Sequence, residues 1–235
     1  MTEDTTPAVG VALVTGAGSG LGAAVATRLA EERFTVAVNT RSRVDDAAAV
    51  VESIRRSGGD GFVVTADVSD PAQVQRMLAT VSERGPLRAL VNNASYRPRQ
   101  EFRSITADDW ANVRGVTLDA GFWCVQAGLP HMGSGATIVN VLGRNALRGD
   151  PARVHVSAAK HGLLGLTLAL AEALRDDGIA VNAVSPGISS SCRRPVACRA
   201  RIADAVVGLA LPRYPMVTGT VQEIECDDLG EVRPE

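Results

Sequence analysis

The stretch "LVTGAGSGLGAAVATRLA", Leu13 to Ala30, decides the fold of this chain. It runs from a β-branched apolar segment through a glycine-rich turn into a segment whose apolar residues recur at helical spacing. Gly16, Gly20 and Gly22 permit a tight turn and let backbone N–H groups approach a phosphate at the positive end of a helix. A strand, a glycine turn and a helix in this order predict a nucleotide-binding βα unit.

The same alternation repeats along the chain and predicts an α/β fold. Strands are expected at 11–15, 35–39, 62–66, 89–93, 137–141, 180–184 and 220–224, and helices at 20–33, 45–57, 72–84, 107–131 and 154–176. The strands are nearly continuous apolar runs, which is typical of a parallel sheet covered by helices on both faces. We therefore predict a single Rossmann-like, doubly wound domain over residues 9–230 with about seven parallel strands. Its ligand crevice should lie at the carboxyl ends of the strands.

Composition sets limits on partners and location. The 235 residues carry a formal net charge of -2, which gives no general attraction to nucleic acid or to an anionic membrane. The longest apolar run, "GLLGLTLALAEAL", contains Glu172 and predicts a buried helix rather than a membrane span. The acidic start of the chain does not match a signal peptide, so residues 1–8 are expected to be a disordered leader, 231–235 a tail, and the location cytoplasmic. The four cysteines form no CxxC pair and predict reduced thiols without a metal; they are Cys124, Cys192, Cys198 and Cys226.

The basic residues contain one exception. Of 24 Lys plus Arg residues, 23 are arginine, and the single lysine is Lys160 in "RVHVSAAKHG". An ammonium is a compact three-way donor, whereas a guanidinium is a flat fork. We infer that position 160 specifically requires the compact donor.

The residues after the second strand indicate which dinucleotide would bind. An Asp or Glu at this place would bond a ribose 2′-hydroxyl, but the chain reads "VNTRSR". Arg41 is able to pair with a 2′-phosphate, which favours NADP(H) and leaves NAD(H) open. The alternative is that Arg41 is a solvated loop charge.

Taken together, these motifs resemble the short-chain dehydrogenase/reductase family over about Val9 to Gly230. The matching segments are "TGAGSGLG" (Thr15–Gly22), "ADV" (Ala66–Val68), "NNA" (Asn92–Ala94), "IVNV" (Ile138–Val141), Lys160 and "VNAVSPG" (Val181–Gly187). The resemblance implies that the cofactor is held by Gly16, Ser19, Gly20, Leu21, Gly22, Arg41, Asp67, Val68, Asn93, Ala94, Lys160, Pro186, Gly187 and Ile188. Within this set Asp67 and Val68 would hold the adenine, Lys160 the nicotinamide ribose, and residues 186–188 would flank the nicotinamide.

The same resemblance shows what is absent. The family uses an Asn, Ser, Tyr, Lys tetrad in which the tyrosine is the general acid and the serine orients the carbonyl. Val156 stands at the tyrosine position, Gly143 at the serine position and Thr117 at the asparagine position. "NNAS" replaces the family's "NNAG", and the substrate loop at 188–200 is short. A positioned general acid contributes ~10²–10⁴-fold to a rate, so the family mechanism cannot operate unchanged.

Other side chains are candidates for the missing chemistry. Tyr96, which follows "NNAS", is a candidate substitute acid, or else an aromatic residue on the rim of the site. His155 is next to the vacant position, but adjacent helical residues point about 100° apart; His155 and His161 are otherwise packing or surface residues. An acidic substrate or acyl carrier is a possible ligand for the loop arginines, which are Arg144, Arg148, Arg193, Arg194, Arg199 and Arg201.

Three functions remain open at this stage. The first is an atypical, ketoreductase-like NADP(H)-dependent reductase of a bulky carbonyl substrate, free or bound to a carrier. The second is a catalytically silent subunit that partners an active homologue, and the third is a non-redox cyclase, isomerase or lyase on the same fold. The family's long helices also imply a homodimer or homotetramer. If only the proton donor is missing, Gly143→Ser combined with Val156→Tyr should create measurable reduction of generic ketones.

Overall fold

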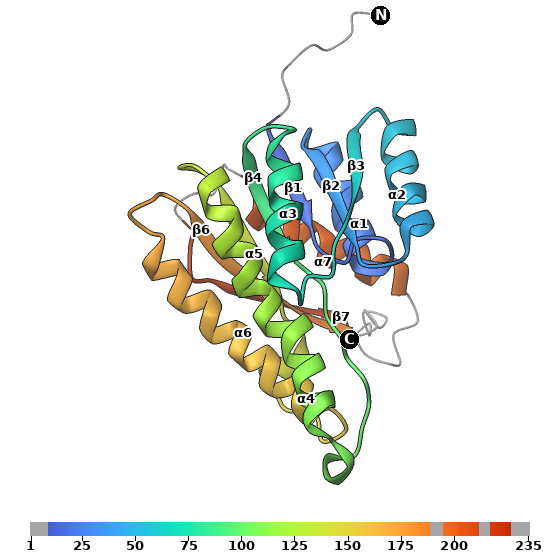
Figure 1. Cartoon of the computed structure of the whole chain (residues 1–235), viewed down its shortest axis with the longest axis vertical. Coiled ribbons are helices and arrows are strands. Elements are labelled where there is room, and N and C mark those ends of the chain that lie inside the picture. The colour runs from blue at the N-terminus through green and yellow to red at the C-terminus, as the bar shows by residue number, and fades with distance from the viewer. Residues whose placement is uncertain (1–8, 189–194, 212–216, 227–235) are drawn as a thin grey trace, which may run out of the picture.

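The computed structural model describes residues 9–188, 195–211 and 217–226, and these residues form one parallel sheet between two helical layers (Figure 1). The sheet has seven strands in the order β3-β2-β1-β4-β5-β6-β7. The strands are β1 (Val11–Val14), β2 (Thr35–Thr40), β3 (Asp60–Thr65), β4 (Leu87–Asn92), β5 (Thr137–Val141), β6 (Ala180–Ile188) and β7 (Val221–Cys226). The predicted doubly wound parallel fold is confirmed, and the strand order changes direction between β1 and β4.

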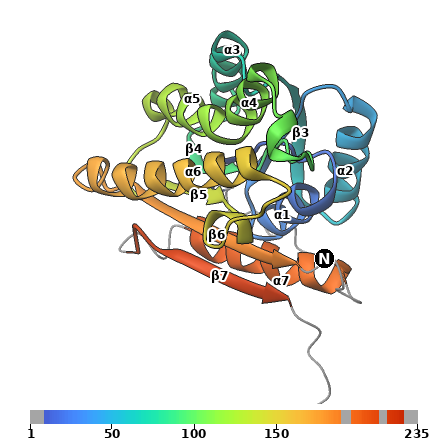
Figure 2. The ribbon, with the colours of Figure 1, turned by 90° about the horizontal axis from the view of Figure 1, so that it is seen from below.

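Helices cover both faces of the sheet, as Figure 2 shows from below. The helices are α1 (Gly20–Glu31), α2 (Val44–Arg56), α3 (Pro71–Ser82), α4 (Ala107–Arg114), α5 (Ala120–Gly128), α6 (Val154–Ala173) and α7 (Pro195–Ala210). Buried residues of α1, α2 and α7 form a core on one face, and those of α3 and α5, with the end of α6, form a second core on the other face. Because both faces are covered, the strands are apolar along almost their whole length.

One predicted helix is interrupted. The sequence pattern predicts a continuous helix over 107–131, but a π-helical turn at Gly115–Asp119 separates α4 from α5. A π turn inserts an extra residue and rotates the following helix about its axis, and such turns often occur at functional sites. Thr117, at the position that the family resemblance assigns to asparagine, lies within this turn.

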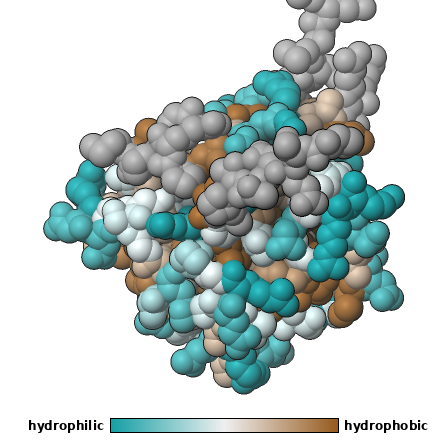
Figure 3. All heavy atoms as spheres, turned by 90° about the horizontal axis from the view of Figure 1, so that it is seen from above, coloured by the Kyte–Doolittle hydropathy of each residue, from teal (hydrophilic) through white to brown (hydrophobic). Residues whose placement is uncertain are grey.

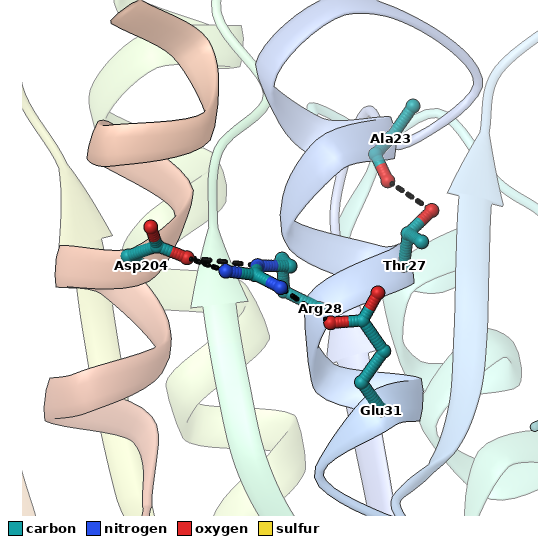
Figure 4. A network of polar contacts seen from close by, with 5 residues as sticks. All are labelled: Ala23, Thr27, Arg28, Glu31 and Asp204. Atoms are coloured by element: carbon teal, nitrogen blue, oxygen red, sulfur yellow. Dashed lines mark hydrogen bonds and ion pairs between the residues drawn. The ribbon is translucent and has the colours of Figure 1, made fainter. Parts of the chain in front are cut away.

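The chain between β6 and α7 is short, since β6 ends at Ile188 and α7 begins at Pro195. The predicted leader (1–8), the tail (231–235) and residues 189–194 of the predicted short loop lie outside the described residues, as do Cys192, Arg193 and Arg194. Helix α7 is joined to α1 by an ion pair. Arg28 of α1 donates two hydrogen bonds, from Nε at 2.8 Å and Nη2 at 2.6 Å, to Asp204 of α7, and it also pairs with Glu31 (Figure 4).

Helix α6 is the one helix among the described residues that is long and apolar enough to cross a membrane by length and composition. Its side chains have another explanation, because Val156, Leu163, Thr167 and Ala171 are buried inside the domain. The prediction of a buried helix for "GLLGLTLALAEAL" holds for one face only, because Leu168 and Ala169 are exposed. Seen from above the view of Figure 1, the described surface mixes hydrophilic residues with apolar areas (Figure 3).

Candidate functional site

The turn between β1 and α1 forms a cradle that only glycine permits. Gly16 and Gly20 both have φ of +62°, a left-handed conformation that L side chains rarely adopt. A Cβ atom on Gly22 would lie 2.5 Å from Asn93 Nδ2 and 2.6 Å from the Gly16 carbonyl oxygen. The Ser19 side chain makes no cap hydrogen bond at the α1 N-terminus. The cradle therefore fits the phosphate of a nucleotide at a helix N-terminus, as the sequence predicts.

A hydrogen-bonded clamp holds this turn against the end of β4. Thr15 Oγ1 accepts hydrogen bonds from the backbone N–H groups of Asn93 and Ala94, both at 3.0 Å. The Asn93 amide in turn donates to the carbonyl oxygens of Thr15 at 2.8 Å and Gly16 at 3.1 Å. The side chain of Asn93 thus fixes the wall of the crevice, and this structural role was not predicted from the sequence.

Asn39, at the end of β2, is a second positioning residue that the sequence reasoning missed. Its Oδ1 accepts from the Gly16 N–H at 3.1 Å, and its Nδ2 donates to the Ala66 carbonyl at 3.2 Å. One buried amide therefore joins the glycine turn to the loop after β3. A polar residue within the apolar run "VAVNT" was the available indication.

Two arginines lie at the far end of the crevice. Arg41 is exposed and approaches Asp67 at 3.6 Å, while Arg43 Nη1 lies 3.4 Å from Ser19 Oγ. Burial acts to raise the pKa of Asp67, but hydrogen bonds from Ser69 and the charge of Arg41 outweigh it, so this pKa is lowered. The predicted Arg41 is in place, and Arg43, which the sequence reasoning missed, stands closer to the helix N-terminus.

Lys160 lies at the carboxyl end of β5. Only 2% of the residue is exposed, and Nζ donates to the Val141 carbonyl oxygen at 2.6 Å. Burial, assisted by the positive charge of Arg97, lowers the pKa of Lys160 to about 7. A buried amine with one recorded acceptor has capacity for further hydrogen bonds to a ligand.

At the positions that the resemblance assigns to tyrosine and serine, the packing and the backbone conformation fit the residues that are present, Val156 and Gly143. Val156 is 1% exposed and packs in an apolar cluster with Val113, Ala159 and Leu118. Gly143 has φ 154° and ψ 162°, a backbone region that is essentially restricted to glycine. Neither residue carries a group able to donate a proton to a substrate.

Thr117 and Tyr96 are joined through the backbone. The Thr117 hydroxyl donates to the Tyr96 carbonyl at 3.3 Å and accepts from the Tyr96 N–H at 3.3 Å. Ser95 Oγ lies 3.4 Å from the same hydroxyl. The Tyr96 side chain is 49% exposed, which matches both a rim position and access to a ligand.

The two histidines of α6 lie in different environments. His155 is 1% exposed, and neither of its ring nitrogens has a hydrogen-bond partner. His155 lies on α6, which packs against α4. His161 is exposed, and its Nδ1 lies 3.0 Å from the Ser157 carbonyl oxygen.

Two of the loop arginines have acidic partners within the chain. Arg144 Nη2 donates to Glu225 at 2.7 Å and to the Gly187 carbonyl at 3.1 Å, and Arg148 lies 3.6 Å from Glu225. These contacts tie the loop after β5 to Pro186–Ile188, which pair with β7. Arg144 and Arg148 are thus occupied in holding the loop, and Arg199 and Arg201 lie on α7.

Two observations concern metal binding by the described residues and the thiol of Cys124. They contain no group of three His, Cys, Asp or Glu side chains able to hold a metal ion. Cys124 is fully buried, and burial raises the pKa of its thiol to about 12, so it stays protonated.

Comparison with known proteins agrees with this geometry. The family model for short chain dehydrogenase matches residues 10–195. The 3-oxoacyl-[acyl-carrier-protein] reductase FabG of Staphylococcus aureus is 39% identical over 180 residues, which cover 75% of this chain and 73% of that protein. An uncharacterized oxidoreductase of Escherichia coli, YgfF, is 37% identical over 185 residues, covering 75% of each chain.

Solved structures extend the similarity over nearly the whole chain. The landomycin C-6 ketoreductase LanV, with bound NADP and rabelomycin, has a TM-score of 0.85 and 30% identity, covering 93% of this chain and 95% of that one. The reductase LugOII of lugdunomycin biosynthesis has a TM-score of 0.86 and 30% identity, covering 93% and 96%. The chain belongs to the short-chain dehydrogenase/reductase family.

Proposed function

We propose that the protein is an NADP(H)-dependent reductase of a bulky carbonyl compound, and that it works without the family's tyrosine. The observation that carries this proposal is the buried Lys160, whose Nζ is held by the Val141 carbonyl at the carboxyl edge of the sheet. A lone lysine kept in this position, among 23 arginines, is expected where an ammonium must contact a ligand. Three similar solved structures contain NADP or NADPH, which supports the choice of cofactor.

Different residues of the crevice would bind different parts of the cofactor. The glycine turn with Ser19 and Leu21 would hold the diphosphate, and Asp67 and Val68 would hold the adenine. Arg41 and Arg43 would pair with the 2′-phosphate, because a guanidinium matches a phosphate with two parallel hydrogen bonds. Lys160 would bind the ribose hydroxyls, with Pro186–Ile188 beside the nicotinamide. A bound nicotinamide supplies a hydride, and the protein must provide the proton and the orientation.

The site lacks the general acid that would donate a proton to the substrate. Without a positioned acid at 156, the rate should fall by ~10²–10⁴-fold relative to an intact family site. Tyr96 is the proposed substitute, since its backbone is fixed to Thr117 and its side chain is half-exposed. Only six residues separate β6 from α7, and a connection of this length supports the choice of a bulky substrate.

Binding is the first test. The purified protein is titrated with NADPH and NADH while nicotinamide fluorescence and thermal unfolding are followed. We expect tighter binding of NADPH than of NADH. Arg43→Ala and Arg41→Ala should each weaken the binding of NADPH by ~10-fold or more and leave the binding of NADH almost unchanged. Oxidation of NADPH is then measured with a panel of bulky ketones. Absence of binding to either nucleotide in a folded sample would overturn the proposal.

A second candidate, a catalytically silent subunit, is favoured by the packing of Val156. Val156 packs in an apolar cluster with Val113 and Leu118, and this packing contributes to the fold whether or not the protein is a catalyst. Such a subunit would bind nucleotide, show no turnover with any ketone, and co-purify with an active homologue. The exposed apolar residues Trp110, Phe122 and Leu168, on α4, α5 and α6, suit a contact with another chain.

A further inference from the structure

We propose that Ser95 donates a hydrogen bond to the substrate carbonyl and orients it, and that Thr117 is the residue that positions Ser95. This inference rests on the proposed function, and it gives Ser95 the task that the family assigns to a serine at position 143. In the sequence, Ser95 is the residue that replaces glycine in the family's "NNAG".

Ser95 and Gly143 occupy equivalent places at the ends of neighbouring strands. In the parallel pairing of β4 with β5, Asn92 is the partner of Asn140. Ser95 lies three residues beyond Asn92, and Gly143 lies three residues beyond Asn140. Neighbouring strands are about 4.8 Å apart, so the two loops start side by side at the carboxyl edge of the sheet. The chain therefore has a hydroxyl after β4 in place of the one that is missing after β5.

The loop that carries Ser95 lies where the ligand crevice is expected. The strand order changes direction between β1 and β4, and in such sheets ligands bind beyond the carboxyl ends of the strands at this point. Thr15 Oγ1 accepts hydrogen bonds at 3.0 Å from the N–H groups of Asn93 and Ala94. A Cβ atom on Gly16 would lie 3.0 Å from Ala94 Cα, so the glycine turn packs directly against this loop. Ser95 thus follows residues that are fixed beside the nucleotide cradle.

The Ser95 hydroxyl is held on one side and has capacity left for a ligand. Its Oγ lies 3.4 Å from the hydroxyl of Thr117, a residue that is 2% exposed. The same Thr117 hydroxyl bonds the N–H and the carbonyl oxygen of Tyr96, both at 3.3 Å. A serine hydroxyl has one donor and two acceptor sites, and Thr117 is its one recorded partner among the described residues. Because Ser95 is only half-buried, its other sites are available to a ligand in the crevice.

The pair of hydroxyls suits both the substrate and the product of a carbonyl reduction, because either hydroxyl is able to donate to the other. When Thr117 donates to Ser95, the Ser95 proton is free to bind a carbonyl oxygen. When Ser95 donates to Thr117, the lone pairs of Ser95 accept a hydrogen bond from an alcohol. A carbonyl oxygen has two lone pairs, so it can accept from Ser95 while Tyr96 supplies the proton. Ser95 therefore orients the carbonyl and does not replace the general acid.

Binding is tested with the bulky ketone 1-tetralone, its alcohol 1-tetralol, and tetralin, a hydrocarbon of the same shape without oxygen. The ketone is combined with NADP⁺ and the alcohol with NADPH, so that neither complex reacts, and each titration is repeated without nucleotide. We expect the ketone and the alcohol to bind more tightly than tetralin. Ser95→Ala removes one hydrogen bond, so it should weaken the ketone and the alcohol by ~3–10-fold. The binding of tetralin and of NADP⁺ should stay almost unchanged.

A vibrational measurement separates a direct hydrogen bond from a change in the shape of the site. With ¹³C at the carbonyl of 1-tetralone, infrared difference spectra report the stretching frequency of the bound ketone, which falls when a donor bonds its oxygen. Ser95→Ala should raise this frequency, and Ser95→Thr, which keeps a hydroxyl, should raise it less. Thr117→Val should raise it in part, whereas Thr117→Ser should leave it as in the wild type. The control Ser57→Ala removes an exposed hydroxyl at the end of α2 and should change neither frequency nor binding.

The inference is overturned if 1-tetralone binds no more tightly than tetralin, or if Ser95→Ala leaves the carbonyl frequency of the bound ketone as in the wild type. The titrations without nucleotide keep this result separate from failure of the proposed function. Nucleotide binding with a carbonyl frequency that does not depend on Ser95 removes only the role of Ser95. A ketone site that depends on Ser95, in a protein that binds neither NADPH nor NADP⁺, supports the role of Ser95 and overturns the reductase.

Discussion

Replacement of Lys160 by methionine should change how the stability of the ligand-free protein depends on pH. The wild-type amine is buried, and its pKa is lowered from 10.5 to about 7. Below pH 7 both the folded and the unfolded chain carry the proton, so the folded state bears the full cost of the buried charge. Between pH 7 and 10.5 the folded state has lost the proton and the unfolded chain still holds it, so the free energy of unfolding rises with pH.

The size of this effect follows from the same shift. A shift of one pKa unit corresponds to about 1.4 kcal/mol, so the whole contribution is roughly 5 kcal/mol between pH 7 and 10.5. In Lys160→Met this contribution is absent. The substitution also leaves the Val141 carbonyl without its donor, at a cost of about 1–3 kcal/mol that does not vary with pH. At pH 6 the variant should therefore be the more stable protein.

The assay is urea denaturation of both proteins at half-unit steps from pH 6 to pH 9.5, without nucleotide. The wild-type free energy of unfolding minus that of the variant should rise by about 1.4 kcal/mol per pH unit above pH 7.5, because all other titrating groups are shared. A difference that stays constant over this range would refute the reasoning, since it would mean that the folded protein does not lower the pKa of Lys160. Gln in place of Met provides a polar control of similar length.

Further substitutions test the glycine turn and the vacant tetrad positions. Gly22→Ala should abolish the NADPH-dependent thermal shift and lower stability by about 1–3 kcal/mol, because its Cβ would lie 2.5 Å from the Asn93 amide nitrogen. The control is Gly165→Ala, on an exposed part of α6, where nothing lies within 4 Å of the new Cβ. This control should raise stability by about 0.5–1 kcal/mol. The sequence predicts that Gly143→Ser with Val156→Tyr creates ketone reduction, but the structure adds a cost. The glycine-only backbone at 143 and the packed environment of Val156 should each cost about 1–3 kcal/mol, so circular dichroism must show a folded protein before a negative assay counts against that prediction.

Much of the fold was predictable because its pattern is local. The strand predicted at 137–141 coincides with β5, and the remaining predicted strands overlap β1 to β4, β6 and β7, since an apolar run bounded by turn residues is visible without knowing its neighbours. The helix over 107–131 was predicted without its interruption at Gly115–Asp119. A π turn inserts a single residue into the helix, and one extra residue is difficult to recognise in a pattern of apolar positions.

The site was predictable only in part. Lys160 could be singled out because it is the sole lysine, and Gly22 because the turn leaves no room for a side chain. Arg43 and Asn39 were missed, because their significance depends on contacts with residues far away in the sequence. Asn39 meets Gly16, 23 residues earlier, and Ala66, 27 residues later.

The sequence by itself determined the parallel α/β fold and the glycine turn of its first βα unit, and it singled out Lys160, since each follows from local periodicity, backbone freedom or composition. The tertiary structure alone decided which charges meet. It pairs Arg144 with Glu225, 81 residues apart, and it brings Arg28 to Asp204, 176 residues apart. The physical reason is that a charge is neutralised by whatever lies within a few ångströms of it in space, and the order of residues along the chain does not fix that distance.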